Sequence, residues 1–195
     1  MNRIDTTRER ILKAAFELIS SRGYLGASTR EIAQQAHVAE VTLFRQFANK
    51  ESLFTEVLRS FTSIATLSEL MHQLKLRPFK EALGTLIKHI EANRNWIRIL
   101  SIEVNHAPDE MKNVYCDFLK QLFAALTDFF THAHECGHIR PDLNPEHAAR
   151  AFHSMVFGFF HTEGLRRIKL DRDTEHADMV DVFVDIFCQG TKTLD

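Results

Sequence analysis

Residues 28–50 read STREIAQQAHVAEVTLFRQFANK, which is two short amphipathic segments on either side of a three-residue break. Ser28 is followed three positions later by Glu31, the Ser-x-x-Glu pattern in which each side chain satisfies a free backbone N–H at a helix start. The apolar residues that follow fall on one face of a helix two turns long: Ile32, Ala33 and Ala36.

The break at residues 37–39, His-Val-Ala, ends that pattern, and a second short helix is expected after it. Its apolar residues stand at helical spacing among polar ones: Val41, Leu43, Phe44 and Phe47. Two short helices joined by a turn of three or four residues have the geometry of a helix-turn-helix, whose second helix lies in the DNA major groove. Periodicity alone fits an ordinary helical hairpin equally well.

The residue types across this region resemble the N-terminal signature of the TetR family of one-component bacterial transcriptional regulators. The resemblance runs without gaps from about Arg8 to Leu58, over three consecutive helices. It is carried by Thr29-Arg30-Glu31-Ile32-Ala33, Val38, Thr42-Leu43-Phe44-Arg45-Gln46-Phe47 and Asn49-Lys50-Glu51-Ser52-Leu53. It implies a DNA-binding regulator. The remaining two thirds of the chain resemble the family only in helix count, length and pattern.

The composition favours an all-α fold, because 195 residues with only seven Gly and four Pro leave little room for a sheet protein rich in turns. We expect an N-terminal three-helix helix-turn-helix DNA-binding domain over residues 1–50 and a C-terminal helical ligand-binding and dimerisation domain over residues 51–195. Outside the two short helices, about seven more are predicted: Thr6 to Arg22, Lys50 to the polar stretch 73–77, Phe79 to Ala92, Asn95 to Asn105, Pro108 to Gly137, Glu146 to Arg167 and Glu175 to Gln189.

Several residues predict where these helices begin and end. Thr6 with Glu9 repeats the capping-box pattern, and Asn49 is expected to cap the helix that begins at Lys50. Gly23 and Gly190 are expected to stop the first and the last helix. In the turn before the recognition helix, a histidine, His37, replaces the family's usual glycine; it tolerates a left-handed backbone better than most non-glycine residues.

Charge and cysteine content limit the function classes. Residues 1–50 carry eight Lys or Arg and five Asp or Glu, whereas residues 51–195 carry sixteen and twenty-one, so the N-terminal part is the basic one. No run of eighteen apolar residues exists, and we expect no membrane span. The odd number of three widely spaced cysteines argues against a disulfide framework and favours a reducing cytoplasm.

The resemblance places residues at DNA along the recognition helix and at the starts of its neighbours. Lys50 is expected to pair with a phosphate at a helix N-terminus, which itself attracts anions. Thr42 and Phe44, the latter in place of the family's usual tyrosine, bond to or pack against the DNA backbone, and Gln46 can donate where a histidine is usual. Phosphate contacts are also expected from the start of the preceding helix: Ser28, Thr29 and Arg30.

Positions early in the recognition helix should face base edges. Val41 offers apolar contact to a thymine methyl, and Glu40 can accept from a cytosine amino group. Arg45 can read guanine or hold a phosphate. Two alternatives stay open. In one, Glu40 interacts favourably with the helix dipole and touches no DNA. In the other, Phe44 and Phe47 occupy core positions, Phe47 the more strongly.

The middle of the chain is expected, by the same resemblance, to enclose a cavity for a hydrophobic or aromatic small molecule. The candidate lining residues are Trp96, Ile99, Leu100, Glu103, Tyr115, Phe118, Leu122, Phe152, Met155 and Phe159. An aromatic stripe at helical spacing also fits a simple packed core, and that interpretation is the better one for any single residue.

The last two helices are expected to form a homodimer interface, because a terminal helix that is apolar almost all round needs burial on more than one face. In the TetR resemblance these helices meet their twofold mates in a four-helix bundle. The candidate interface residues are His153, Phe157, Phe160, Val180, Phe183, Val184 and Phe187. A twofold axis would also give two recognition helices for two DNA half-sites.

No metal site or cofactor is expected. The segment HAHECGH at residues 132–138 has histidines four apart, but it stands at a helix end, where the helix dipole favours histidine, and has no paired ligand motif elsewhere. An enzyme is not expected either, because the sequence shows no nucleophile–base pair and no phosphate-binding loop.

The sequence therefore predicts a cytoplasmic DNA-binding regulator whose partners are double-stranded operator DNA, a small hydrophobic ligand and a second copy of itself. We expect a repressor that the ligand releases by shifting the helix that begins at Lys50. The alternative is a DNA-binding regulator without a small-molecule ligand, controlled by a protein partner.

Overall fold

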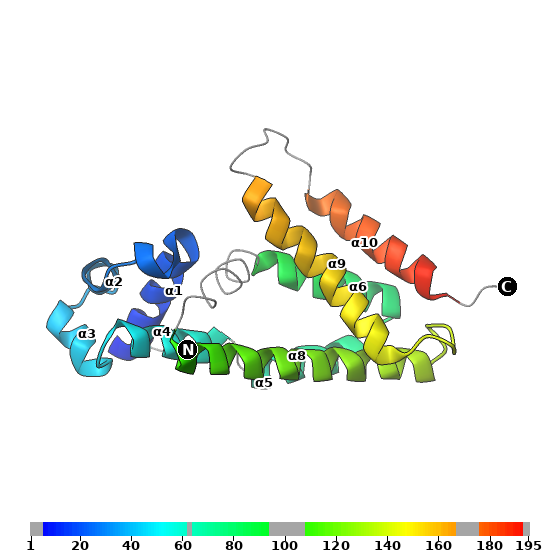
Figure 1. Cartoon of the computed structure of the whole chain (residues 1–195), viewed down its shortest axis with the longest axis horizontal. Helices are drawn as coiled ribbons and strands as arrows, with labels where there is room; N and C mark the ends of the chain where they lie inside the picture. The colour runs from blue at the N-terminus through cyan, green and yellow to red at the C-terminus, as the bar shows by residue number, and fades with distance from the viewer. Residues whose placement is uncertain (1–5, 62–63, 94–107, 167–175, 193–195) are drawn as a thin grey trace, which may run out of the picture. The chain divides into compact units, whose positions relative to one another are not determined.

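A computed structural model describes residues 6–61, 64–93, 108–166 and 176–192. These ranges hold nine α-helices and contain no strand, which confirms the expected all-α fold (Figure 1). In chain order the helices are α1 Thr7–Gly26, α2 Thr29–Gln35, α3 Glu40–Gln46, α4 Lys50–Phe61, α5 Ile64–Lys75, α6 Phe79–Ala92, α8 Asp109–Glu135, α9 Pro145–Arg166 and α10 His176–Thr191. The helix expected at residues 95–105 lies outside the described residues.

The chain divides into two compact units. The first, here called the head, comprises Met1–Ser63 and Asn95–Phe118, and the second, the body, comprises Ile64–Arg94 and Leu119–Asp195. Helix α8 supplies residues to both, since its first ten residues belong to the head and the rest to the body. The sequence-based division at residue 50 stays a prediction.

The head has its own apolar core, built from one face of each of its helices. Helix α1 packs against α2 and α4, and α2 packs against α3. The largest fully buried side chains are Ile11, Ile19, Ile32, Leu43, Leu53, Phe54 and Leu58. Met111, from the first turn of α8, is fully buried in the same core. The apolar spacing of residues 28–50 is reflected in this core. Five of the seven residues at that spacing are buried, and the exposed two are Val41 and Phe44.

The predicted helix starts in the head are confirmed by their hydrogen bonds. Glu31 N donates to Ser28 Oγ at 3.2 Å and Ser28 N donates to Glu31 Oε2 at 3.2 Å, a complete capping box. Thr6 and Glu9 form the second one. At α4, Ser52 N donates to the Asn49 side-chain oxygen at 2.7 Å. Each bond satisfies a backbone donor that the helix cannot pair internally.

Two of the described residues of the head have a positive φ. Gly23, at φ 78° and ψ 170°, interrupts α1 close to the expected end at Arg22, and the last residues assigned to α1 follow that kink. His37, at φ 54°, adopts the left-handed conformation in the turn between α2 and α3. His37 thus takes the backbone conformation that glycine adopts most easily, as its position in the turn requires.

The single helix expected from Lys50 to residues 73–77 is two helices, α4 ending at Phe61 and α5 beginning at Ile64. The apolar spacing continues through both, which is why periodicity does not show the division.

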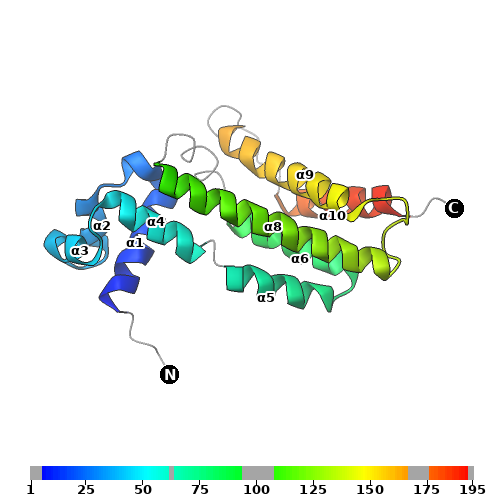
Figure 2. The ribbon, with the colours of Figure 1, turned by 60° about the horizontal axis from the view of Figure 1, so that its bottom comes forward.

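The body packs α5, α6, α9, α10 and residues 119–135 of α8 around an aromatic core. In Figures 1 and 2, α9 and α10 run side by side, and both pack against α6. At the centre, Phe130, Phe152 and Phe187 come from α8, α9 and α10, with ring centroids 5.3–5.7 Å apart. Such tilted and edge-on contacts add to the burial energy of the rings.

The last helix runs one residue past the expected stop at Gly190, to the buried Thr191. Arg140 N, in the α8–α9 connection, donates to the Thr191 carbonyl at 2.8 Å, and the Thr191 hydroxyl donates to Phe187 O at 2.8 Å. This pairing across the fold extends the helix through the glycine. None of the helices in the described ranges has the length and apolar character needed to cross a membrane.

Candidate functional site

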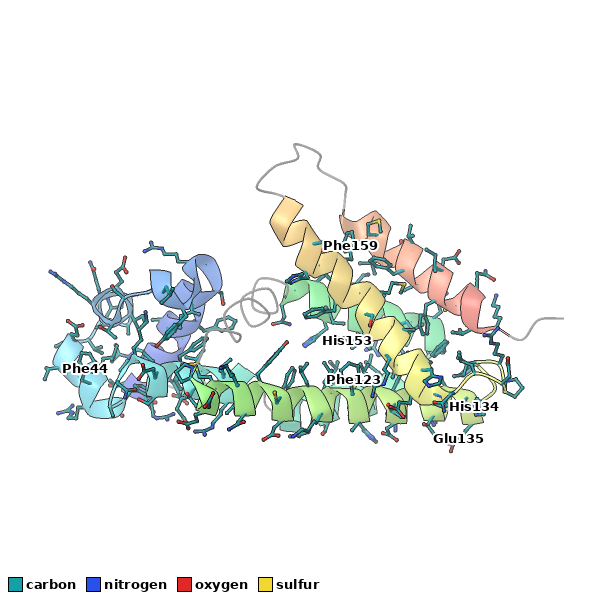
Figure 3. The ribbon with its side chains drawn as sticks, in the orientation of Figure 1. Phe44, Phe123, His134, Glu135, His153 and Phe159 are labelled. Atoms are coloured by element: carbon teal, nitrogen blue, oxygen red, sulfur yellow. The ribbon has the colours of Figure 1, made fainter. Side chains whose placement is uncertain are left out.

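Helix α3 is anchored by one face and presents the other to solvent. Leu43 is fully buried and Phe47, at the C-cap, is 3% exposed, whereas Val41 is 75% and Phe44 44% exposed. Figure 3 shows Phe44 on the outer side of α3. The core role considered for both phenylalanines therefore holds for Phe47 only. A short helix with one face fixed in the core and the other free can enter a DNA groove.

The hydroxyl groups expected to contact phosphate are already engaged within the head. Thr29 Oγ1 donates to Glu40 Oε1 at 2.7 Å and joins the first turns of α2 and α3. Ser28 Oγ donates to Glu31 Oε2 at 2.7 Å within its capping box, and this bond lowers the pKa of the Glu31 carboxyl. A base contact by Glu40 would have to compete with Thr29, which supports the alternative that Glu40 has no DNA contact.

The remaining polar candidates on this side of the head are open to solvent. Arg30, Arg45 and Gln46 are exposed, and Thr42 is half-buried. Arg30 and Arg45 form no ion pair among the described residues, so both guanidinium groups stay available for phosphate or base edges.

Lys50 is positioned by Tyr24, an aromatic residue that was not among the predicted site residues. The Lys50 Nζ lies 4.4 Å from the centre of the Tyr24 ring, and that ring stacks on Phe54 at 4.9 Å. The ring face attracts the ammonium group and restricts where the lysine side chain can go. An aromatic residue directly after Gly23 was the available signal, because a connector on the surface has no need of one unless it packs.

A second unforeseen element fixes the C-terminal end of α3. The Arg8 guanidinium lies 4.9 Å from the Phe47 ring centre and its Nη2 donates to Glu56 Oε2 at 2.7 Å. Arg59 donates to Glu56 at 2.9 Å and to Glu110 of α8 at 3.1 Å. The hydrogen bonds from Arg8 and then Arg59 lower the pKa of the Glu56 carboxyl. Arg8 thus holds α1, α3 and α4 together.

Comparisons with known proteins agree with this geometry. The family model described as bacterial regulatory proteins of the tetR family matches residues 11–57, and the model of the AefR-like transcriptional repressor C-terminal domain matches residues 75–190. The chain belongs to the TetR family. It is a transcriptional regulator of that family, and the resemblance read from residues 28–50 is confirmed.

Individual TetR-family relatives match over most of their length. The HTH-type regulator YvkB of Bacillus subtilis is 34% identical over 159 residues, which is 79% of this chain and 81% of YvkB. The fatty acid metabolism regulator of the same organism is 28% identical over 157 residues, 76% of each protein. The crystal structure of B. subtilis FadR with stearoyl-CoA has a TM-score of 0.74 at 22% identity, over 93% of this chain and 97% of FadR.

The residues expected to line a ligand cavity in this TetR-family chain fall into separate groups. Trp96, Ile99, Leu100 and Glu103 lie outside the described residues. Tyr115 packs on the core of the head, where burial raises the pKa of its hydroxyl, and Phe118 is the half-buried last residue of that unit. The other four belong to the body, where Phe152 is buried in the core and Leu122, Met155 and Phe159 are half-buried against it.

The expected dimer residues lie mostly inside the body. Five of the seven are 2–7% exposed and belong to its core: Phe160, Val180, Phe183, Val184 and Phe187. His153 and Phe157 are half-buried and stack on each other at 5.1 Å. The opposite side of α10 instead exposes Val182, at 42%, and Ile186, at 58%. In the sequence, the buried and the exposed apolar residues of α10 belong to one continuous apolar pattern. Only the fold shows which of them are covered.

The histidine-rich end of α8 is engaged in packing. His138 stacks on Phe79 at 5.7 Å, His134 Nε2 lies 3.1 Å from the Pro141 carbonyl oxygen, and His132 Nε2 lies 3.7 Å from Cys136 Sγ. In the described ranges no group of three or more His, Cys, Asp or Glu side chains is placed to hold a metal ion.

Proposed function

We propose that this TetR-family regulator is a homodimeric repressor, which binds double-stranded operator DNA through α3 and leaves it when a small hydrophobic ligand occupies the body. The observation that carries the DNA-binding part is the outward face of α3. Val41, Phe44 and Arg45 are exposed on a helix that Leu43 and Phe47 fix to the core. A protein acting in this way on genomic DNA works in the cytoplasm.

Phosphate contacts in this proposal come from cations rather than hydroxyls. Lys50, held over Tyr24, together with Arg30 and Arg45, supplies the positive charge that dominates affinity for DNA. Ser28 and Thr29 shape the head by their internal hydrogen bonds and reach phosphate only if those bonds open. Thr42 and Gln46 remain proposed contacts, because neither side chain bonds to another residue in the part of the chain that the structure describes.

The repressor part is supported by the match of residues 75–190 to a repressor C-terminal domain. The ligand class is supported by the body itself, whose core is built largely from phenylalanines of α8, α9 and α10, with Met155 and Met179 packed against it. A similarly folded regulator carries stearoyl-CoA. We propose a long-chain acyl compound or a comparably hydrophobic molecule, held near Leu122, Phe152, Met155 and Phe159.

Helix α8 is the proposed link between ligand and DNA. It is continuous from Asp109 to Glu135, with Met111 buried in the core of the head and Phe130 in the core of the body. Its first turn also reaches Arg59 of α4 through Glu110, at 3.1 Å. Because the helix expected from Lys50 is divided after Phe61, α8 replaces it as the element through which a ligand would act.

The proposed dimer interface is the exposed side of α10, with Val182 and Ile186 at its centre, joined by the half-buried His153 and Phe157 of α9. The five buried candidates support this face from behind instead of touching the partner. Two copies would present two α3 helices to half-sites about 34–36 Å, one DNA turn, apart or a multiple of it.

The test joins binding and release. Fluorescence anisotropy with DNA selected by the full chain should show saturable binding, and palmitoyl-CoA or stearoyl-CoA should raise the melting temperature and weaken binding at least tenfold. A tenfold change corresponds to about 1.4 kcal/mol of preference for the state that does not bind DNA. Tight DNA binding that no acyl compound alters would remove the ligand part and favour control by a protein partner.

Repression is tested separately with a reporter gene placed behind the selected operator. Expression should be low with the wild-type chain and restored by an Arg45→Ala, Lys50→Ala double variant. Expression that rises with the wild-type chain would show an activator.

A further inference from the structure

The exposed face of α3 carries two large apolar side chains. Val41 and Phe44 are three residues apart, on neighbouring turns, and are 75% and 44% exposed. Of the seven residues of α3, two therefore place large apolar side chains in water. Single exposed apolar residues are ordinary on protein surfaces, but two on one face of a recognition helix call for a partner with apolar groups.

The polar residue next to Val41 is engaged within the head. Glu40 precedes Val41 directly, and its carboxylate accepts the Thr29 hydroxyl at 2.7 Å, with both residues half-buried. Ala39, the N-cap, offers no side-chain hydrogen bond. Val41 is therefore the large apolar side chain that the first turn of α3 exposes.

The major groove offers one apolar feature, the 5-methyl group of thymine, since the other base-edge groups there are hydrogen-bond donors or acceptors. We infer that Val41 is a specificity-determining residue that selects a pyrimidine with a 5-methyl group, normally thymine, in each half-site. Glu40 is a positioning residue that joins α2 to α3 and reads no base. This inference rests on the proposed function, in which α3 enters the major groove.

The experiment uses an operator obtained by selection of random double-stranded DNA on the full-length chain. Each thymine is then replaced by uracil, which removes only the methyl group, and affinity is measured by anisotropy. One thymine in each half-site should be sensitive, with about a fourfold loss per half-site, the effect of exposing one methyl group. Substituting both half-sites should give about a fifteenfold loss.

The Val41→Ala variant tests whether Val41 is the residue that recognises the thymine methyl group. It should bind the thymine and uracil operators within twofold of each other, whereas Leu25→Ala should keep the full discrimination. Leu25 is a matched control because it is 86% exposed in the same unit and lies outside α3. At the sensitive position, 5-methylcytosine should bind the wild-type chain about fourfold better than cytosine does, since that pair also differs by one methyl group.

Glu40→Gln tests the positioning role, because the amide oxygen still accepts from Thr29. It should leave the base preference at every position unchanged, while Glu40→Ala lowers the melting temperature of the head. A new preference in Glu40→Gln would overturn the role assigned to Glu40.

The inference about Val41 fails if no uracil substitution changes wild-type affinity by more than twofold, or if the effect persists in Val41→Ala. In both cases operator binding itself is intact, so the proposed function survives. If selection yields no preferred sequence at all, the proposed function fails first.

Discussion

Helices α3 and α10 both expose apolar side chains, but in opposite electrostatic surroundings. On α3, Val41 and Phe44 stand beside the exposed Arg45, with Lys50 at the start of the next helix. On α10, Val182 and Ile186 stand beside the exposed carboxylates Asp181 and Asp185. An acidic flank repels DNA and a basic one attracts it, so similar exposure indicates different partners.

The comparison also shows how each helix is secured. Helix α3 has seven residues and depends on Leu43, Phe47 and the Arg8 guanidinium over the Phe47 ring. Helix α10 has sixteen residues and buries Val180, Phe183, Val184 and Phe187 against α6 and α9. A helix of this length is not stable alone, so α3 depends on the packing of its inner face against the head.

The largest effect should come from placing a charge on the exposed face of α10. Ile186→Glu should abolish dimerisation, since a carboxylate cannot be buried there without a partner, and should weaken operator binding by about 100-fold or more. Sedimentation velocity and anisotropy measure the two effects. Leu76→Glu is the control, because Leu76 is 76% exposed in the same unit and lies outside α10. A dimeric, fully active Ile186→Glu protein would contradict the proposed interface.

Removing the lysine beside α3 should have the next largest effect. Lys50→Ala should weaken binding about tenfold for all DNA sequences and reduce the salt dependence by about one ion per protomer, because a phosphate contact is lost. Anisotropy at several salt concentrations measures both. The control is Lys88→Ala, which removes an equal charge at an exposed position on α6 of the body. Unchanged salt dependence in Lys50→Ala would displace Lys50 from the interface.

A smaller effect concerns the stability of the body in mild acid. Burial lowers the pKa of His153, whose ring lies 4.8 Å from Phe123 and 5.1 Å from Phe157, while Arg150 lies over Phe123. The unfolded chain takes up this proton near the ordinary value of 6.5, the folded chain only at lower pH. Stability from His153 is therefore complete above pH 6.5 and lost as pH falls through the folded pKa.

Urea unfolding of the full chain between pH 7.5 and 5 measures this loss. His153→Gln should make the free energy of unfolding depend less on pH. His147→Gln, at an exposed position on the same helix, should leave that dependence unchanged. Figure 3 shows His153 and Phe123 pointing toward each other between α9 and α8. If the free energy of unfolding of His153→Gln depended on pH as it does in the wild type, the imidazole would be solvated in both the folded and the unfolded chain.

The smallest effect is expected in the head, under stronger acid. Hydrogen bonds from Arg8 and Arg59 lower the Glu56 pKa from its ordinary 4.5, so this contribution is complete above pH 4.5 and disappears as pH falls through the folded pKa. Glu56→Gln should cost about 1 kcal/mol or less at pH 7, as expected of a largely solvated ion pair, and should remove part of the acid dependence. Urea unfolding below pH 4.5 measures this. The same pH dependence of the free energy of unfolding in the wild type and in Glu56→Gln would contradict the expectation.

Much of the head was predictable because its signals are local. Capping boxes, apolar spacing and the turn at His37 each involve residues within a few positions of one another. The division after Phe61 and the extension of α10 through Gly190 were not, because the apolar period hides the first and a bond from Arg140 produces the second.

For the candidate sites, the sequence indicated which helices to consider but not which of their residues are exposed. Spacing cannot show which side of an apolar helix a neighbour covers, so Phe183 and Ile186 looked equivalent until α6 and α9 were placed. In the same way, the Thr29–Glu40 bond joins residues eleven positions apart across a turn, so spacing alone could not show that the Glu40 carboxylate is engaged within the head.

The central claim is that two copies of this chain read DNA with α3. Selection of genomic fragments by the full-length protein, followed by footprinting, tests it most directly. The expected result is an inverted repeat with half-site centres about one DNA turn, roughly 34–36 Å, or a multiple of it apart, both protected together. Recovered fragments with no common repeat, or protection of one half-site only, would contradict it.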